Sequence, residues 1–244
     1  MECSFFMPTS SFCVFGLEPF PHVVEGDDVV AAILASASGT TQLRDGDILV
    51  LASKIVSLEE GRRVRLDGVV PSREARELAE RTGKDPRLLQ LVIEESRSYR
   101  LAKPAGPVLA FHRLGYELTS AGVDRDTQET AVLLPVDPDA SAERIRVAIR
   151  ERANIRTAVI IADSDGRGDR RGAIVLAVGA AGIGPLRVTF HEGKRQEETL
   201  VDLLAGAAGV VLGQRGRGVP VVVLRGVEFE EGDGGMRSLL HHSG

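Results

Sequence analysis

The stretch Asp47-Ile48-Leu49-Val50-Leu51-Ala52 is an almost unbroken apolar run that follows the turn residues Asp45-Gly46. A run without polar alternation is typical of a strand that is covered on both faces. A second such run, residues 157–162, ends directly before Asp163. Because helical stretches separate these runs, the sequence predicts a mixed α/β (α+β) fold. Acidic side chains at the end of such a strand are well placed to face a ligand.

Helix signals lie on both sides of these runs. Ser72 follows Pro71 as a typical N-cap, and Asp85-Pro86 provides a capping side chain and a proline in the first turn. Residues 108–118 are typical of a hairpin, and residues 219–224 of a last strand. We expect helices at residues 29–37, 72–82 and 141–152, after Pro86, and at residues 198–212.

The length of 244 residues fits one large domain or two small ones. We expect a single ligand-binding domain over residues 1–228, with a candidate boundary near residues 100–107, where prolines would divide it into two subdomains. The apolar opening, residues 1–15, lacks the basic start of a signal peptide and fits a buried strand or a loosely ordered start. Residues 229–244 are rich in glycine and acidic residues, and we expect a disordered tail there.

Composition argues against several functional classes. Apolar residues make up 43% and charged residues 27% of the chain, as in soluble proteins, and no apolar run reaches the roughly 18 residues that span a bilayer. The net charge of −5 disfavours a general nucleic-acid binder, which needs a basic surface. The two cysteines, Cys3 and Cys13, lack a metal-binding spacing. We therefore expect a cytoplasmic protein whose partners include neither nucleic acid nor membrane.

Chemistry-bearing side chains gather just after the second apolar run. Residues 163–170 contain three aspartates, one serine, two glycines and two arginines. Carboxylate and hydroxyl oxygens suit a hard divalent cation, glycines let the backbone approach a phosphate, and arginines can clamp phosphate oxygens. The alternative is a polar surface loop, because the same residue types are common in turns.

Three weaker features accompany this one. The stretch Asp124-Arg125-Asp126 offers either metal ligands or turn residues with a neighbouring salt bridge. The pair Ser53-Lys54 follows the first apolar run, where a lysine can meet a phosphate or remain solvated. Residues 212–219 combine glycines with arginines, which suits an anion, a flexible hairpin or a helix that ends at Gly213.

Several familiar catalytic motifs are absent from the sequence. It has no P-loop, no dinucleotide-binding glycine motif after a strand, no nucleophile elbow and no zinc-binding histidine cluster. His22, His112 and His191 are scattered, and we expect structural roles for them. Any nucleotide must therefore be held without a P-loop.

The order of these features resembles one known family. Besides the stretches above, the chain contains Gly26-Asp27-Asp28, Gly83-Lys84-Asp85-Pro86-Arg87, Ala121-Gly122-Val123-Asp124-Arg125 and Leu134-Pro135-Val136-Asp137-Pro138-Asp139. Together they resemble the coenzyme F420-0:gamma-glutamyl ligases over residues 16–226. The resemblance implies a two-part mixed α/β ligase fold and a homodimer.

The resemblance also implies a reaction. That family joins L-glutamate to the lactyl carboxylate of F420-0 and then extends a gamma-linked tail, using GTP, Mg or Mn, and often potassium. A carboxylate is a poor acyl donor, so phosphoryl transfer from GTP would first form an acyl phosphate, which the glutamate amine attacks. Bound divalent cations would neutralise the charge that develops on the phosphates.

Site residues follow from the same resemblance. By position, the metal ligands are Asp124, Asp163, Ser164 and Gln214. The nucleotide-binding positions are Leu17, Glu18, Pro19, Phe20, Ser53, Lys54, Leu212, Gly213, Gln214, Arg215, Gly216, Arg217, Gly218 and Val219. We assign catalytic roles to Asp163 and, as clamps on phosphate or on the anionic substrate, to Arg167 and Arg170.

The chain departs from the family pattern near the site. Leu58 stands where a second lysine is usual, and Thr127 where an asparagine contacts nucleotide. Asp165, Gly168 and Asp169 replace Phe, Pro and Trp, and a polar loop is shortened to residues 187–198. These changes leave two alternatives open: the same ligase chemistry on a different acid acceptor, and a catalytically silent protein that binds nucleotide or F420.

Overall fold

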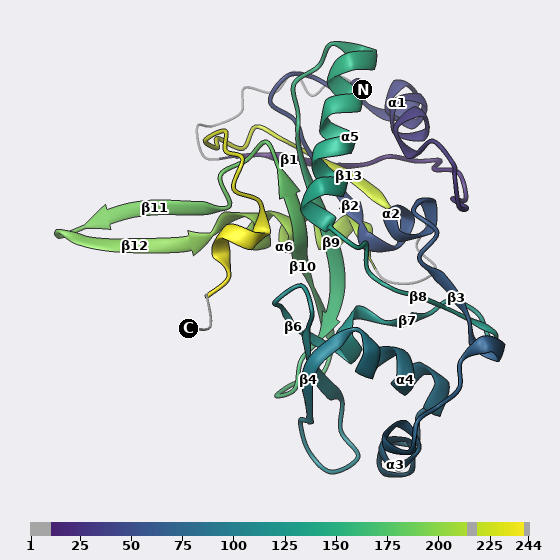
Figure 1. Ribbon diagram of the computed structural model, residues 1–244. Helices are drawn as coiled ribbons and strands as arrows, with labels where there is room; N and C mark the ends of the chain where they lie inside the picture. The colour runs from purple at the N-terminus through teal and green to yellow at the C-terminus, as the bar shows by residue number, and fades with distance from the viewer. Residues whose placement is uncertain (1–10, 214–218, 242–244) are drawn as a thin grey trace.

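A five-stranded sheet lies at the centre of the computed structural model, which describes residues 11–213 and 219–241 (Figure 1). β2 and β9 are parallel neighbours, and every other neighbouring pair in this sheet is antiparallel. In spatial order its strands are β1 (Cys13–Gly16), β13 (Val221–Arg225), β2 (Ile48–Ala52), β9 (Ala158–Gly166) and β10 (Ala173–Ala181).

The parallel pair is formed by the two apolar runs predicted from the sequence. Ala52 lies opposite Ala162, so both strands carry their chains toward the same edge of the sheet. β9 continues to Gly166, beyond the predicted end, because residues 163–166 pair with β10 in a long antiparallel hairpin. The alternative of a polar surface loop therefore does not hold for residues 163–166, where strand pairing outweighs the turn preference of Asp, Ser and Gly.

Helices cover both faces of this sheet. One face packs against α1 (Val29–Thr40), α2 (Ser53–Glu59) and α5 (Pro138–Ala153), and the other against α6 (Leu200–Leu212) and η3 (Met236–Leu239). The side chains of β2 alternate between these two cores, which explains its continuous apolar sequence. The predicted helices are confirmed, although α5 begins earlier, because Asp137 caps the backbone N–H of Ala140 and Pro138 starts the first turn.

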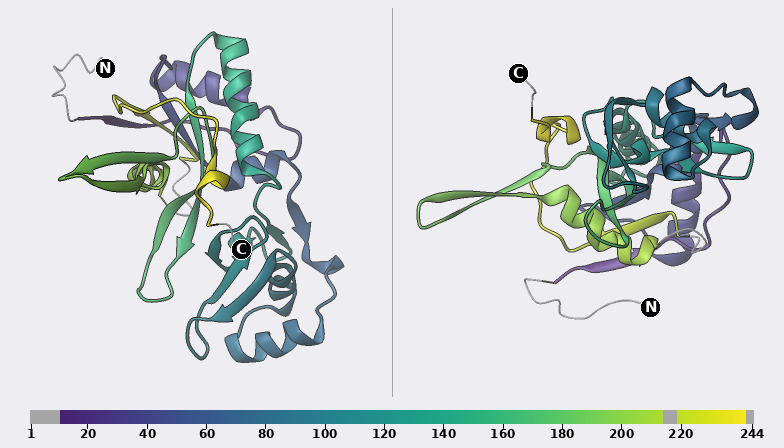
Figure 2. Two further views of the ribbon diagram at one scale, coloured as in Figure 1. Left: turned by 60° about the vertical axis from the view of Figure 1, so that its left-hand side comes forward. Right: turned by 90° about the horizontal axis from the view of Figure 1, so that it is seen from below.

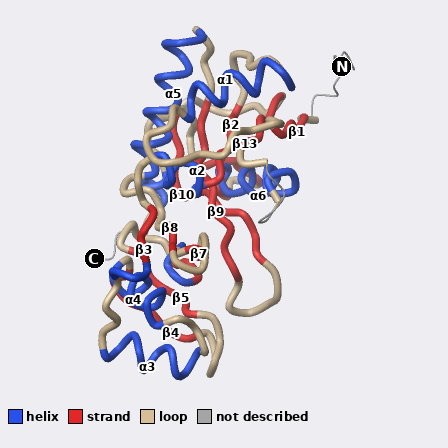
Figure 3. Tube along the Cα trace, turned by 90° about the vertical axis from the view of Figure 1, so that its right-hand side faces the viewer, coloured by secondary structure: helices blue, strands red, loops and turns tan. Residues whose placement is uncertain are grey.

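Residues 63–132 form a smaller part below the sheet (Figure 3). It contains two hydrophobic cores. In the first, α3 (Arg73–Thr82) and α4 (Pro86–Glu94) pack on a small sheet, and the second lies beside another small sheet. The predicted caps hold, since Ser72 accepts from the N–H of Ala75 and Asp85 from that of Arg87. The elements are β3 (Arg63–Arg65), η1 (Leu66–Gly68), α3 (Arg73–Thr82), α4 (Pro86–Glu94), β4 (Ser96–Leu101), β5 (Val108–His112), β6 (Glu117–Thr119), η2 (Ser120–Gly122), β7 (Asp124–Arg125) and β8 (Thr130–Val132).

The division into two parts differs from the predicted boundary. Residues 100–107 join β4 to β5 within the smaller part, and Ala102 donates to the carbonyl of Pro107 across that turn. The prolines therefore lie in the turn between β4 and β5 and not in a linker, and the hairpin predicted for residues 108–118 is formed by β5 and β6. The chain instead enters the smaller part after Arg62 and leaves it before Leu133, whose N–H donates to the carbonyl of Arg62.

A long hairpin projects from the body of the molecule (Figures 1 and 2). It consists of β11 (Leu186–His191) and β12 (Lys194–Thr199), and its side chains are almost all exposed. The sequence suggested only a shortened loop over residues 187–198 and placed the start of the next helix at residue 198. The pairing of β11 with β12 moves that start to Leu200.

The C-terminal segment is placed through residue 241, in contrast to the disordered tail expected from the sequence. Met236 is buried, and the carboxylate of Asp139 accepts from the backbone N–H groups of Met236 and Arg237. These contacts anchor η3 to the start of α5. Across the two described ranges, no helix is long and apolar enough to cross a membrane.

Candidate active site

The parallel strands place a serine and an aspartate side by side. Because Ala52 and Ala162 are in register, Ser53 and Asp163 follow at the same sheet edge. The Ser53 hydroxyl donates to Oδ1 of Asp163 at 2.7 Å. The carboxyl ends of parallel strands are the usual place for a ligand in a sheet of this kind.

A cleft of about 770 Å³ opens at this edge, between the large sheet and the smaller part. Both parts contribute to it, with Ser53 and Asp163 on one side and Asp124 on the other. Its volume is within the range of small-molecule sites. The lining residues that carry polar side chains are His22, Ser53, Lys54, Ser57, Thr119, Asp124, Asp126, Asp163 and Ser164.

Two ion pairs join the walls of the cleft. Nζ of Lys54, at the start of α2, lies 2.8 Å from Oδ1 of Asp126 and 3.3 Å from Oδ2 of Asp124. Arg63 contacts the other oxygen of Asp126 at 3.0 Å. Lys54 therefore bridges the large sheet and β7, and Asp126 holds its ammonium group in place.

The carboxylates of the cleft differ in their affinity for protons. Burial raises the pKa of Asp163 to about 6, against the opposing hydrogen bonds from Ser53 and the Ser164 backbone, and the charges of Asp124 and Asp165 add to the rise. Burial also opposes the charge on Asp126, but Lys54 and Arg63 outweigh it and leave the pKa of Asp126 below its usual value. Asp163 therefore binds a proton more tightly than Asp126 does.

Comparison with known proteins decides the family. A sequence profile described as F420-0:gamma-glutamyl ligase matches residues 19–226. The chain belongs to this family. Among its relatives, the coenzyme F420:L-glutamate ligase of Methanothermobacter thermautotrophicus is 39% identical in an alignment of 239 residues that covers 93% of this chain and 94% of that protein. The proteins of the same name from Archaeoglobus fulgidus and Methanopyrus kandleri are 36% and 37% identical; the alignments cover 93% and 88% of this chain, and 92% and 88% of theirs.

The F420-0:gamma-glutamyl ligase family inferred from the motifs is thus confirmed. The mixed α/β fold and the assignment to the acid–amino-acid ligases are confirmed with it. The geometry then shows where each predicted site residue lies. Those that line the cleft are Phe20, Ser53, Lys54, Asp124, Asp163, Ser164, Leu212, Gly213 and Val219.

Other predicted residues lie elsewhere. Leu17 is buried in the core, and Leu17, Glu18 and Pro19 precede the part of the chain that lines the cleft. Among the described residues around the cleft, neither Arg167 nor Arg170 is found. Both are exposed at the far end of the β9–β10 hairpin and pair with Asp169. Their predicted role as clamps has no support in this geometry.

Five predicted nucleotide-binding positions fall outside the described residues. They are Gln214, which is also a predicted metal ligand, together with Arg215, Gly216, Arg217 and Gly218. The residues on either side of them, Gly213 and Val219, both line the cleft.

Thr119 lines the cleft but was not singled out in the sequence. For Asp126 the sequence offered a metal ligand or a turn residue with a neighbouring salt bridge; the structure shows a salt bridge, but its partner Lys54 lies 72 positions earlier in the chain. The spacing between them carries no signal, because the contact depends on how the two parts meet. The one clue in the sequence was that Asp126 lies two positions after Asp124, a candidate metal ligand.

The cleft offers the oxygen donors that a hard divalent cation prefers. Carboxylates of Asp124 and Asp163 and the hydroxyl of Ser164 face it from two walls, and a bound cation would stabilise the charged form of Asp163, which burial disfavours. Within residues 11–213 and 219–241, no three acidic, His or Cys side chains already form a ligand set. Water and substrate phosphates would supply the remaining ligands, as is common for Mg²⁺.

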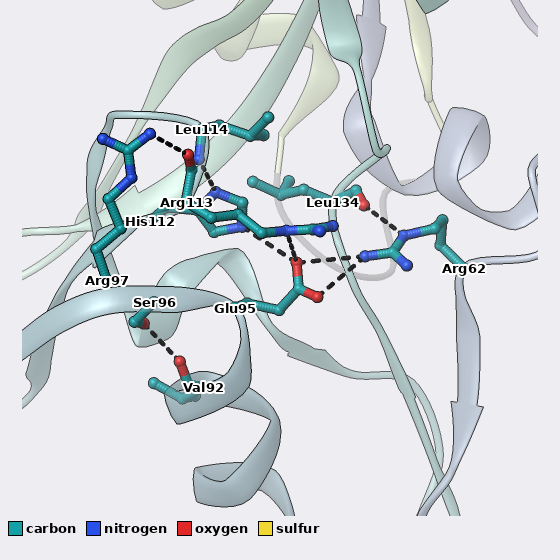
Figure 4. A network of polar contacts seen from close by, with 9 residues as sticks. All are labelled: Arg62, Val92, Glu95, Ser96, Arg97, His112, Arg113, Leu114 and Leu134. Carbon is teal, nitrogen blue, oxygen red and sulfur yellow. Dashed lines mark hydrogen bonds and ion pairs between the residues drawn. The ribbon is translucent and has the colours of Figure 1, made fainter.

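A polar cluster around the buried Glu95 joins the smaller part to the segments through which the chain enters and leaves it (Figure 4). The carboxylate of Glu95, at the end of α4, accepts from Arg62 at 3.2 and 3.3 Å and from Arg113 at 2.9 Å. Arg62 also donates to the carbonyl of Leu134. Nδ1 of His112 accepts from Leu114, so Nε2 carries the ring proton and lies 3.4 Å from Glu95, too long for a good hydrogen bond.

Proposed function

We propose that this protein adds L-glutamate to F420-0 through an amide bond, with GTP as phosphoryl donor and Mg or Mn as the required cation. One observation carries the proposal: in a chain of this ligase family, Asp163 and Ser53 face Asp124 across a cleft large enough for a nucleotide. The family's homodimer and its potassium ion belong to the same proposal.

The residues of the cleft divide into those for the metal and those for the nucleotide. Asp124, Asp163, Ser164 and Gln214 would hold the divalent cation, which when bound supplies charge neutralisation on the phosphates. Lys54 is placed to meet a phosphate as a point charge, since its ammonium group already lies in the cleft. Leu212, Gly213 and Val219, which line the cleft, would contact the nucleotide.

The proposed reaction has two steps. An oxygen of the F420-0 carboxylate attacks the γ-phosphorus of GTP, the bond to the bridging oxygen breaks, and GDP leaves with that electron pair. The neutral amine of glutamate then attacks the acyl carbon, phosphate leaves, and the amine loses its proton to solvent. The protein contributes position and charge stabilisation more than covalent chemistry.

Product mass tests the proposal. Incubation with F420-0, L-glutamate, GTP and Mn²⁺ should yield product that is heavier by one or more glutamyl units. Asp163→Ala should reduce the rate at least about a hundredfold, because it removes a proposed ligand of the cation. Asp169→Ala is the matched control, since Asp169 lies on the same hairpin but is exposed and outside the cleft; it should retain activity.

The same assay distinguishes the alternatives. Leu58 is buried and lines the cleft where the family usually has a lysine, which favours a second candidate, a ligase for a different acid acceptor. GTP-dependent glutamylation of another acid, with none of F420-0, would establish that candidate. GTP binding without any turnover would instead establish a silent binding protein and contradict the proposed ligase.

A further inference from the structure

Asp165 occupies a buried position that the reaction does not use directly. It lies two residues after Asp163 on β9, and side chains two apart in a strand share a face of the sheet. It does not line the cleft within the described residues, whereas Asp163 and Ser164 do.

Asp165 joins the large sheet to the smaller part. Its Oδ1 accepts from the backbone N–H of Thr119 at 2.6 Å. In return, the Thr119 hydroxyl donates to the carbonyl of Gly166 at 3.0 Å. A Cβ on Gly166 would lie 3.2 Å from that hydroxyl, so the absence of a side chain helps the two segments approach. Two hydrogen bonds therefore connect the end of β9 to the end of β6.

Thr119 directly precedes the turn that leads to Asp124. The next three residues, Ser120, Ala121 and Gly122, all have left-handed φ angles of 54°, 52° and 65°. Two of them are not glycine, and such a conformation persists only when its surroundings hold it. At the far end, Asp124 pairs with Val132 in the sheet of β7 and β8. The strained turn is thus fixed at both ends, and Asp165 fixes the first.

We propose that Asp165 is a positioning residue that sets where Asp124 lies relative to Asp163. It does so as a hydrogen-bond acceptor for Thr119, without contacting the metal or the substrates. The proposal rests on the proposed function, since Asp124 and Asp163 are the residues whose separation matters there. The aspartate replaces the phenylalanine usual for the family, so this link would be a property of this chain.

Two substitutions of Asp165 distinguish the role of its hydrogen-bond-accepting oxygen from the role of its negative charge. Asp165→Asn keeps an oxygen that can accept from Thr119 but removes the charge, whereas Asp165→Ala removes both. We expect Asp165→Ala to lower kcat by about tenfold to a hundredfold with a smaller change in KM for glutamate, because misplacement by about an ångström affects the reacting geometry most. Asp165→Asn should keep most of the wild-type kcat.

Hydrogen exchange and metal titration provide readouts besides activity. The Thr119 amide should exchange slowly in the wild type and in Asp165→Asn, and much faster in Asp165→Ala. Affinity for Mn²⁺ should stay close to the wild-type value in Asp165→Asn and should be clearly lower in Asp165→Ala. Asp202→Ala is the matched control, because Asp202 also accepts a backbone N–H, from Ala177 at 3.0 Å, but lies away from the cleft. It should destabilise the fold without changing kcat.

Two results would overturn the proposal. If Asp165→Asn loses kcat and Mn²⁺ affinity as fully as Asp165→Ala, the charge of Asp165 matters and its role is not that of an acceptor. If the Thr119 amide exchanges equally fast in the wild type and in Asp165→Ala, the link does not hold the turn. An inactive wild type would refute only the proposed function, because exchange at Thr119 and Mn²⁺ titration still decide the role of Asp165.

Discussion

Under the proposed function, a proton and a metal ion would compete for Asp163. Its pKa of about 6 in the metal-free protein means that the carboxyl group is largely protonated below that pH, and a metal ligand must be deprotonated to bind. We expect the affinity for Mn²⁺ to rise by about tenfold per pH unit up to about pH 6 and to level off above it. Calorimetric titrations on both sides of that pH measure the effect.

The stability of the metal-free fold should respond with the opposite sign. The folded pKa of Asp163 lies above its usual value of 3.8, so ionisation over this interval lowers the free energy of unfolding as pH rises. Asp163→Asn should remove that component. In the Mn²⁺ titrations described above, Asp169→Ala should show the wild-type dependence of affinity on pH. A wild-type affinity that does not change with pH would show that protonation of Asp163 does not limit metal binding.

Single residues could be predicted where a local pattern determines them. Asp163 and Ser53 follow apolar runs directly, and a parallel sheet brings such ends together. Family resemblance located Asp124 as well. The contacts of Lys54 with Asp126 and of Asp165 with Thr119 were not predictable, because they depend on how the two parts of the fold meet, and no local sequence spacing encodes that arrangement.

At the scale of elements, α6 offers a direct test of packing against β10. A Cβ on Gly209 would lie 2.7 Å from a methyl group of Val175, whereas at Gly206 the nearest atom is a carbonyl oxygen at 4.0 Å. Gly209→Ala should therefore destabilise the protein by about 1–3 kcal/mol through overpacking. Gly206→Ala, in the same helix, should be neutral or stabilise it by up to about 1 kcal/mol.

Urea unfolding of the two variants measures this difference. The helical propensity gained is the same at both positions, so their comparison isolates the contact with Val175. Equal stability of the two variants would mean that α6 can shift away from β10 without loss.

Elements were predictable when their own sequence carried the signal. The capped helices α3 and α4 are examples, with Ser72 and Asp85 at their starts. The extension of β9 to Gly166 and the β11–β12 hairpin were not predicted, because polar strands owe their conformation to a paired neighbour. The start of α5 was available in the sequence, since Asp137-Pro138 repeats the pattern of Asp85-Pro86.

At the scale of the whole molecule, Glu95 holds the two parts together. Burial opposes its charge, but His112, Arg113 and Arg62 outweigh burial and leave the pKa of Glu95 below its usual 4.5. Glu95→Ala should lower the free energy of unfolding by about 3 kcal/mol, because two arginines would lose their buried partner. The contribution is complete above pH 4.5 and should be lost as pH falls through the lower folded pKa.

An exposed pair serves as the control for this prediction. Glu117 contacts Arg100 at 3.1 Å, with more than half of each side chain exposed. Glu117→Ala should change stability by less than about 1 kcal/mol. Urea unfolding at neutral and acidic pH compares the two variants, and equal losses would show that the Glu95 cluster does not act as a buried ion pair.

The order of strands in the central sheet bears on how the chain folds as it is synthesised. β1 pairs with β13, so Cys13 cannot form its strand contact until Arg225 has emerged from the ribosome. For the same reason, Ile48 cannot pair until Ala158 has been synthesised. Residues 63–132, by contrast, contain every strand of their two small sheets, although β3 pairs with β8 at the other end of this segment. Early folding of that insertion would shorten the loop that β2 and β9 have to close and reduce its entropic penalty. We expect a nascent chain that acquires its smaller part first and the cleft between the two parts only near the end of translation.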